Sequence, residues 1–145
     1  MKKIPLVILI AVLFFSCVKE KLELKSIKIV GINNHTFLID HNRKLIISDR
    51  NKKELDTAKL YSDSGEGCNS YLFESGSNFI LVDCNGSWFE IDKENGKINL
   101  EAWKWKKSLP QNYIGTFIYE NGKYKMTKEK SLSIEKIYKY KDPND

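Results

Sequence analysis

Apolar and polar positions alternate along most of the chain after residue 25, and a period of two is typical of half-buried β-strands. The alternating segments are rich in Ile, Val, Phe, Tyr and Trp, which favour a pleated sheet. They cover residues 26–32, 35–41, 44–49, 69–75, 78–84, 87–92, 97–105, 113–119 and 123–128. We therefore predict an all-β fold, an antiparallel meander of about eight to ten short strands that forms a small barrel or a sandwich.

Short links rich in Gly and Asn separate these segments, and such links tolerate the positive φ angles of tight hairpin turns. Strands joined this closely must be antiparallel neighbours, so residues 69–105 are predicted to form a continuous meander of four strands. Two segments are ambiguous. Residues 51–60 could form a short helix, and residues 131–140 fit a strand or a helix, with a strand preferred. The links are Ser75-Gly76-Ser77, Asn85-Gly86, Asn95-Gly96 and Asn121-Gly122.

The N-terminus shows a different pattern, a short basic start followed by an uncharged apolar run. Lys2 and Lys3 precede the run, which extends from Ile4 to Phe15 and ends at Ser16-Cys17. Its length suits the apolar core of a secretory signal peptide. It is short for a membrane-spanning helix, which needs about 20 apolar residues. The pattern predicts an exported protein.

The segment Leu13-Phe14-Phe15-Ser16-Cys17 resembles the lipobox of bacterial lipoproteins. The resemblance implies that a signal peptide, residues 1–16, is removed and that Cys17 receives lipid. The chain would then be held in the cell envelope by that lipid, in a leaflet that the sequence leaves open. Phe14 and Phe15 depart from the usual lipobox, and an ordinary cleaved signal or a short uncleaved anchor are the alternatives. Heavy use of Lys, Asn and Ile also resembles small lipoproteins of Bacteroidota.

On this division, residues 17–25 are the lipidated cysteine and a charged tether, 26–141 a single β domain, and 142–145 a tail. Removing the signal peptide lowers the net charge from +5 to +3, because two lysines are lost and no acid. The remaining charges are well mixed along the chain. Since nucleic-acid binding requires a clustered basic surface, we expect no nucleic-acid partner.

The chain has three cysteines, and lipid on Cys17 would leave Cys68 and Cys84 as a pair. Export permits a disulfide between them. If Ser75-Gly76-Ser77 forms a three-residue hairpin loop, the two cysteines face each other across the hairpin. A two-residue Gly-Ser turn would shift the register by one and point them to opposite faces, unless a bulge intervenes. We predict the disulfide together with the three-residue loop.

No catalytic motif is present, and we predict neither enzyme activity nor a cofactor. His35 and His41 would lie about 20 Å apart on one extended strand, too far for a shared metal ion. The acidic loop 62–67 is interpreted as solvated because it offers few of the oxygen ligands that calcium needs. Residues 79–101 are weakly similar to a β-propeller repeat, through Asp92 and the Gly96-Lys97 pair, with Trp103 beyond.

Aromatic side chains are the features that favour binding. Trp103 and Trp105 share one strand face, and Tyr138 and Tyr140 alternate with lysines. Such side chains either fill the core or form a surface for a protein or glycan ligand. We expect a non-catalytic binding or structural role at the envelope. The alternatives are an immunity-type lipoprotein that blocks a toxin or a lysozyme-like enzyme, and a small envelope hydrolase.

Overall fold

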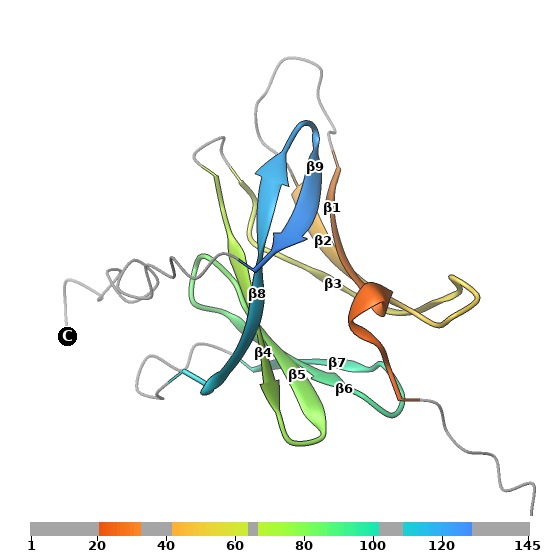
Figure 1. The fold of residues 1–145 in the computed structure, drawn as a ribbon. Coiled ribbons are helices and arrows are strands. Elements are labelled where there is room, and N and C mark those ends of the chain that lie inside the picture. Colours follow the sequence, from red (N-terminus) through yellow and green to blue (C-terminus); the bar gives the residue numbers. More distant parts are fainter. Residues whose placement is uncertain (1–20, 33–41, 64–66, 102–108, 129–145) are drawn as a thin grey trace, which may run out of the picture.

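The structure is a computed structural model that describes residues 21–32, 42–63, 67–101 and 109–128. These residues form one short 3-10 turn, η1 (Leu24–Ser26), and two antiparallel sheets (Figure 1). The smaller sheet has the order β1-β2-β3 and the larger one β7-β6-β5-β4-β8-β9. The strands are β1 (Ile27–Ile32), β2 (Asn42–Ser48), β3 (Glu54–Lys59), β4 (Ser70–Ser75), β5 (Asn78–Val82), β6 (Trp88–Asp92), β7 (Ile98–Glu101), β8 (Asn112–Glu120) and β9 (Lys123–Thr127).

The predicted all-β antiparallel fold is confirmed, and the architecture is two open sheets rather than a closed barrel. Strands β4 to β7 are consecutive neighbours, as the meander prediction requires. The turn between β8 and β9 is Asn121-Gly122, with φ angles of 51° and 81°. Both values are positive, which explains why this hairpin uses Asn and Gly.

The ambiguous segment 51–60 contains a strand and not the short helix that its sequence also fits, because Glu54–Lys59 is β3 and pairs with β2. A bulge between Ile47 and Ser48 interrupts that ladder. Pairing along a neighbouring strand overrides a weak local preference for helix. The predicted strand over 35–41 and the ambiguous segment 131–140 lie outside the described residues.

Most of the core lies between the two sheets. Leu45 and Ile47 of β2 face Leu72, Leu81 and Ile91 of the larger sheet, and all five are fully buried. A second cluster occupies the opposite face of the larger sheet, so its central strands are buried on both faces. This double burial explains the continuous apolar run in β5. The second cluster contains Tyr71, Phe73, Ile80, Val82 and Trp88.

The open edges of the two sheets approach each other on both sides of the core. On one side β1 lies beside β9, and on the other β3 lies beside β7. There the Ile98 amide donates a hydrogen bond to the Asp56 carboxylate over 2.8 Å. Side chains thus connect edges that no backbone ladder joins in the described residues.

The ordered contacts begin before β1. The Leu22 amide donates a hydrogen bond to the Lys93 carbonyl over 2.6 Å, and Leu22 and Leu24 pack against the inter-sheet core. The folded part therefore extends into the segment 17–25 that we assigned as a tether. Across the described residues, no helix has the length and apolar character needed to span a bilayer.

Candidate functional site

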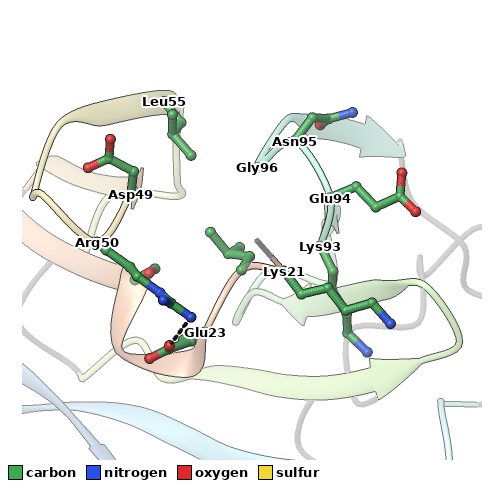
Figure 2. Close-up of a pocket in the computed structure, with 11 residues that line it drawn as sticks. Lys21, Glu23, Asp49, Arg50, Leu55, Lys93, Glu94, Asn95 and Gly96 are labelled. Atoms are coloured by element: carbon green, nitrogen blue, oxygen red, sulfur yellow. Dashed lines mark ion pairs between the residues drawn. The ribbon is translucent and has the colours of Figure 1, made fainter. Parts of the chain in front are cut away.

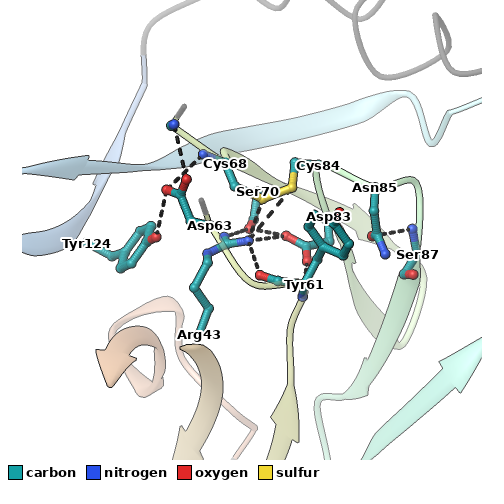
Figure 3. Close-up of polar contacts among 11 residues, drawn as sticks. Arg43, Tyr61, Asp63, Cys68, Ser70, Asp83, Cys84, Asn85, Ser87 and Tyr124 are labelled. Carbon is teal, nitrogen blue, oxygen red and sulfur yellow. Dashed lines mark hydrogen bonds and ion pairs between the residues drawn. A yellow bond between two sulfur atoms is a disulfide. The ribbon is translucent and has the colours of Figure 1, made fainter. Parts of the chain in front are cut away.

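The most polar interior feature is Arg43, whose side chain has no solvent exposure. It lies on β2, where alternation places it on the same face as Leu45 and Ile47. From there it reaches from the smaller sheet towards the loops that end the strands of the larger sheet (Figure 3). A buried guanidinium is costly unless it is paired and hydrogen-bonded.

Arg43 has both kinds of partner. Its Nη1 atom donates to Asp83 Oδ1 over 2.9 Å and to the Tyr61 carbonyl over 3.3 Å, and its Nη2 atom donates to Ser70 Oγ. Asp83 also accepts a 2.7 Å hydrogen bond from Ser70 Oγ and a 2.9 Å bond from the Tyr61 amide. Four segments of chain are therefore joined by one buried ion pair.

The predicted disulfide between Cys68 and Cys84 is present, with a Cα–Cα distance of 5.4 Å. It lies against the same ion pair, since Arg43 Nη1 is 2.7 Å from Cys68 Sγ (Figure 3). Asp83, the immediate neighbour of Cys84, is completely buried. The disulfide and the Arg43–Asp83 pair therefore form one cluster, which we call the Arg43 cluster: Arg43, Ser70, Asp83 and the Cys68–Cys84 bond.

The hairpin register that we predicted with the disulfide is wrong. Ser75 pairs with Asn78, so Gly76 and Ser77 form a two-residue turn, with a φ of +55° at Gly76. The disulfide forms nonetheless because both cysteines lie beyond the paired strands, which span Ser70–Ser75 and Asn78–Val82. Outside the ladder, the rule of alternate faces no longer fixes where a side chain points.

Tyr124 of β9 covers the cluster from the outer edge of the larger sheet. The Arg43 Cζ atom is 5.0 Å from the centre of its ring. Its hydroxyl donates to Asp63 Oδ2 over 3.4 Å. Burial raises the pKa of Tyr124 above its ordinary value, and the Arg43 charge opposes this rise.

Asp63 was expected in a solvated acidic loop, but its side chain is buried. It accepts hydrogen bonds from the amides of Gly67, at 3.2 Å, and Cys68, at 3.0 Å. These hydrogen bonds hold the backbone at Gly67 and Cys68, directly before the disulfide. The acid therefore shapes the backbone at this point. Residues 64–66 of the same loop lie outside the described residues.

Two sulfur atoms and a carboxylate, from Cys68, Cys84 and Asp83, lie within 4.8 Å of one another. Such a set could ligate a soft or borderline metal if both thiols were free. In this structure the sulfurs are bonded to each other, and the Arg43 guanidinium already gives Asp83 a positive partner. The arrangement is thus suited to holding the chain together.

A shallow pocket lies between the N-terminal segment and two turns (Figure 2). Its volume of about 60 Å³ is enough for about two water molecules. Glu23 at its rim pairs with Lys25 at 2.8 Å and with Arg50 at 3.1 Å. The hydrogen bond and charge of Lys25, assisted by Arg50, lower the pKa of Glu23. This pocket is too small for an organic ligand.

Asp92, Gly96 and Lys97, which carry the similarity to a propeller repeat, form the turn between β6 and β7. Asp92 Oδ1 accepts the Glu94 amide over 2.7 Å, and Gly96 has a φ of +70°. The motif thus has a local role in this turn. Trp88 is buried in the second cluster. Five predicted site residues lie outside the described residues: Cys17, Trp103, Trp105, Tyr138 and Tyr140. The two histidines that were not expected to share a metal ion, His35 and His41, also lie outside them.

No sequence pattern led us to predict a role for Arg43, Ser70 or Asp83. A signal for Arg43 was available, because its alternation with Leu45 and Ile47 places it on the apolar face of β2. Asp83 also gave a signal, because it stands between an apolar run and a cysteine. An exposed acid is unusual in such a position. Their pairing across 40 residues carries no local signal.

No protein-family model, curated protein or solved structure matches this chain. The interpretation of function therefore depends on the chain's own residues and geometry.

Proposed function

We propose that this protein is a lipid-anchored, non-catalytic binding protein of the bacterial cell envelope. The Leu13–Cys17 segment supports the lipid anchor by its resemblance to a lipobox. The Cys68–Cys84 disulfide supports export, because such bonds persist mainly outside the reducing cytoplasm.

The observation that carries the binding role is a group of exposed apolar side chains around the Arg43–Tyr124 contact. Ile32, Tyr61 and Tyr119 are 42%, 58% and 39% exposed. Ile32 pairs with Asn42, the residue before Arg43. The backbone carbonyl of Tyr61 accepts a hydrogen bond from Arg43. The ring centre of Tyr119 lies 5.1 Å from that of Tyr124. We call Ile32, Tyr61 and Tyr119 the aromatic end of the domain.

Three segments of chain, from both sheets, contribute to the aromatic end. Exposed tyrosines offer a large contact area at a low cost in side-chain entropy, and they are enriched in protein-binding sites. A protein surface or a glycan is therefore the class of partner that this end suits.

The polar groups support a binding role over a hydrolytic one. Among the described residues, Arg43, Ser70 and Asp83 direct their hydrogen bonds to one another inside the fold. The Asp63 carboxylate also points inward, so this acid does not offer its charge to a basic enzyme, the target that the inhibitor alternative requires.

Site-specific photo-cross-linking in the native cell tests this proposal. A photoreactive phenylalanine analogue is placed at Tyr61 or Tyr119, with Leu100 as the control. Leu100 is 63% exposed and lies on β7, at the opposite edge of the larger sheet from β9. We expect one defined adduct from positions 61 and 119 and none from 100. Equal adducts at all three positions, or none at 61 and 119, would refute the binding surface.

The lipid anchor has its own test. Metabolic labelling with palmitate should mark the wild-type protein and leave a Cys17→Ala variant unlabelled. A Cys17→Ala variant that still labels and matures normally would refute the anchor, whatever the cross-linking result.

A further inference from the structure

The path of the chain from Cys17 into the fold is short. Leu22 is hydrogen-bonded to the Lys93 carbonyl, and only five residue steps separate it from Cys17. A fully extended chain covers about 3.3–3.6 Å per residue, so these steps reach about 18 Å at most. If Cys17 carries lipid, which is our proposed function, the part of the domain around Lys93 must lie close to the membrane surface.

Three segments meet at this part of the domain. The N-terminal residues from Lys21, the turn between β2 and β3, and the turn between β6 and β7 line the shallow pocket of Figure 2. In Figure 1 both turns project towards the side on which the N-terminal chain enters the fold. We call this the entry end of the domain. The Asn121-Gly122 turn lies away from it, beside the far end of β1.

Several charges at the entry end are neutralised locally. Glu23 pairs with Lys25 and Arg50, and the Glu74 carboxylate pairs with Lys93 at 2.5 Å. Three basic and two acidic residues form these pairs, so together they leave a charge of +1. The carboxylates of Asp49 and Glu94 line the same pocket.

Other lysines at the entry end have no such partner. Lys21, Lys52 and Lys53 are exposed, and none of them forms an ion pair within the described part of the chain. The Asp49 side chain accepts the Lys53 amide over 2.8 Å, and Lys52 adopts a φ of +65°. This bond shapes the turn, whose central residues are Arg50 and Asn51, and it holds the two adjacent lysines on the exposed stretch that follows.

We propose that the entry end lies against anionic lipid headgroups, which Lys21, Lys52 and Lys53 contact, and that the aromatic end points away from the membrane. The short reach from Cys17 selects this end, and its unpaired lysines match a negative surface. Each lysine close to an anionic membrane strengthens surface binding by about fivefold. The orientation leaves Ile32, Tyr61 and Tyr119 accessible to a partner in the aqueous compartment.

Lysine footprinting on vesicles tests the orientation. The mature lipidated protein is reconstituted into phosphatidylcholine vesicles, with or without phosphatidylglycerol, and acetylated with an activated ester. Peptide mass spectrometry then follows each lysine. With phosphatidylglycerol we expect Lys52 and Lys53 to react about fivefold more slowly, in line with the lysine–membrane attraction. Lys123, exposed beside the Asn121-Gly122 turn, should react equally in both vesicles.

Added salt should remove the protection, since it screens charges beyond about 3 Å at 1 M. A Lys53→Gln variant should lose part of the protection at Lys52, whereas the matched Lys123→Gln variant should not. Equal rates at Lys52 and Lys53 in both vesicles, or protection of Lys123 instead, would overturn the orientation. Protein that fails to float with the vesicles would instead show that the lipid anchor is absent, and both proposals would then fail.

Discussion

Replacing Arg43 with Met tests whether the buried ion pair stabilises this fold. Met keeps much of the side-chain volume but removes the donors to Asp83, Ser70 and the Tyr61 carbonyl. The Asp83 carboxylate then remains completely buried without a positive partner. Removing one partner of a buried ion pair typically costs about 3–5 kcal/mol. This is a large fraction of the total stability of a domain, which is about 5–15 kcal/mol.

Urea unfolding followed by circular dichroism measures this loss. With a slope of about 2 kcal/mol per molar urea, a loss of about 4 kcal/mol lowers the midpoint by about 2 M. Lys44→Met is the matched control, since Lys44 is the next residue and its ion pair with Glu54, at 3.8 Å, is solvent-exposed. Such a surface pair contributes about 0–1 kcal/mol, so the control should unfold near the wild-type midpoint.

A second substitution separates the loss of the charge partner from the loss of packing. Asp83→Asn, added to Arg43→Met, neutralises the stranded carboxylate, and we expect it to recover part of the lost stability. Coupled residues of this kind show interaction energies of about 0.5–3 kcal/mol. An Arg43→Met loss below about 1 kcal/mol, or no recovery in the double variant, would refute the assignment of stability to the ion pair.

Three further predictions concern the disulfide, one glycine and one tyrosine. Replacing Cys68 and Cys84 with Ser should cost about 3 kcal/mol in urea unfolding, as expected for a loop of this size; an unchanged midpoint would contradict it. Gly96→Ala should destabilise more than Gly122→Ala in the same assay. Both have positive φ, but a Cβ at 96 would lie 2.8 Å from a leucine methyl and one at 122 meets nothing within 4 Å; equal losses would refute this reasoning. Because burial raises the pKa of Tyr124, its contribution to stability should be complete below pH 10, the ordinary value, and decline as pH rises above it. Tyr124→Phe should remove that part of the decline.

Alternation, β-favouring residues and the Gly- and Asn-rich turns together predicted the strands of the larger sheet, including β5, which is a continuous apolar run. Alternation alone is not a reliable guide. It failed for β3, because Leu55 and Ala58 fit a helical spacing as well as a strand, and pairing with β2 decided the outcome. It also failed for the β4–β5 register. The sequence Ser75-Gly76-Ser77 fits a two-residue or a three-residue turn. A change of one residue in the turn shifts the strand register by one and moves each side chain to the opposite face of the sheet.

The Arg43 cluster was predictable only in part. The disulfide followed from the cysteine count, and the inward face of β2 could have identified Arg43. Its partners could not be deduced, because Ser70 and Asp83 come from the other sheet and meet Arg43 only after the sheets have packed. The local pattern of apolar and polar residues shows which face of a strand a side chain occupies. It does not show which residues of the other sheet that side chain contacts.

The geometry also suggests why a small domain retains a buried ion pair. Apolar contacts such as those between Leu45 and the larger sheet are not directional, so they tolerate small displacements of one sheet over the other. The planar guanidinium of Arg43 has donors in fixed directions, and it engages Asp83 and Ser70 in one arrangement only. The aromatic end depends on that arrangement, since Tyr61 comes from the smaller-sheet side and Tyr119 from β8. Arg43→Met should therefore weaken cross-linking from position 61 even under conditions in which the variant remains folded.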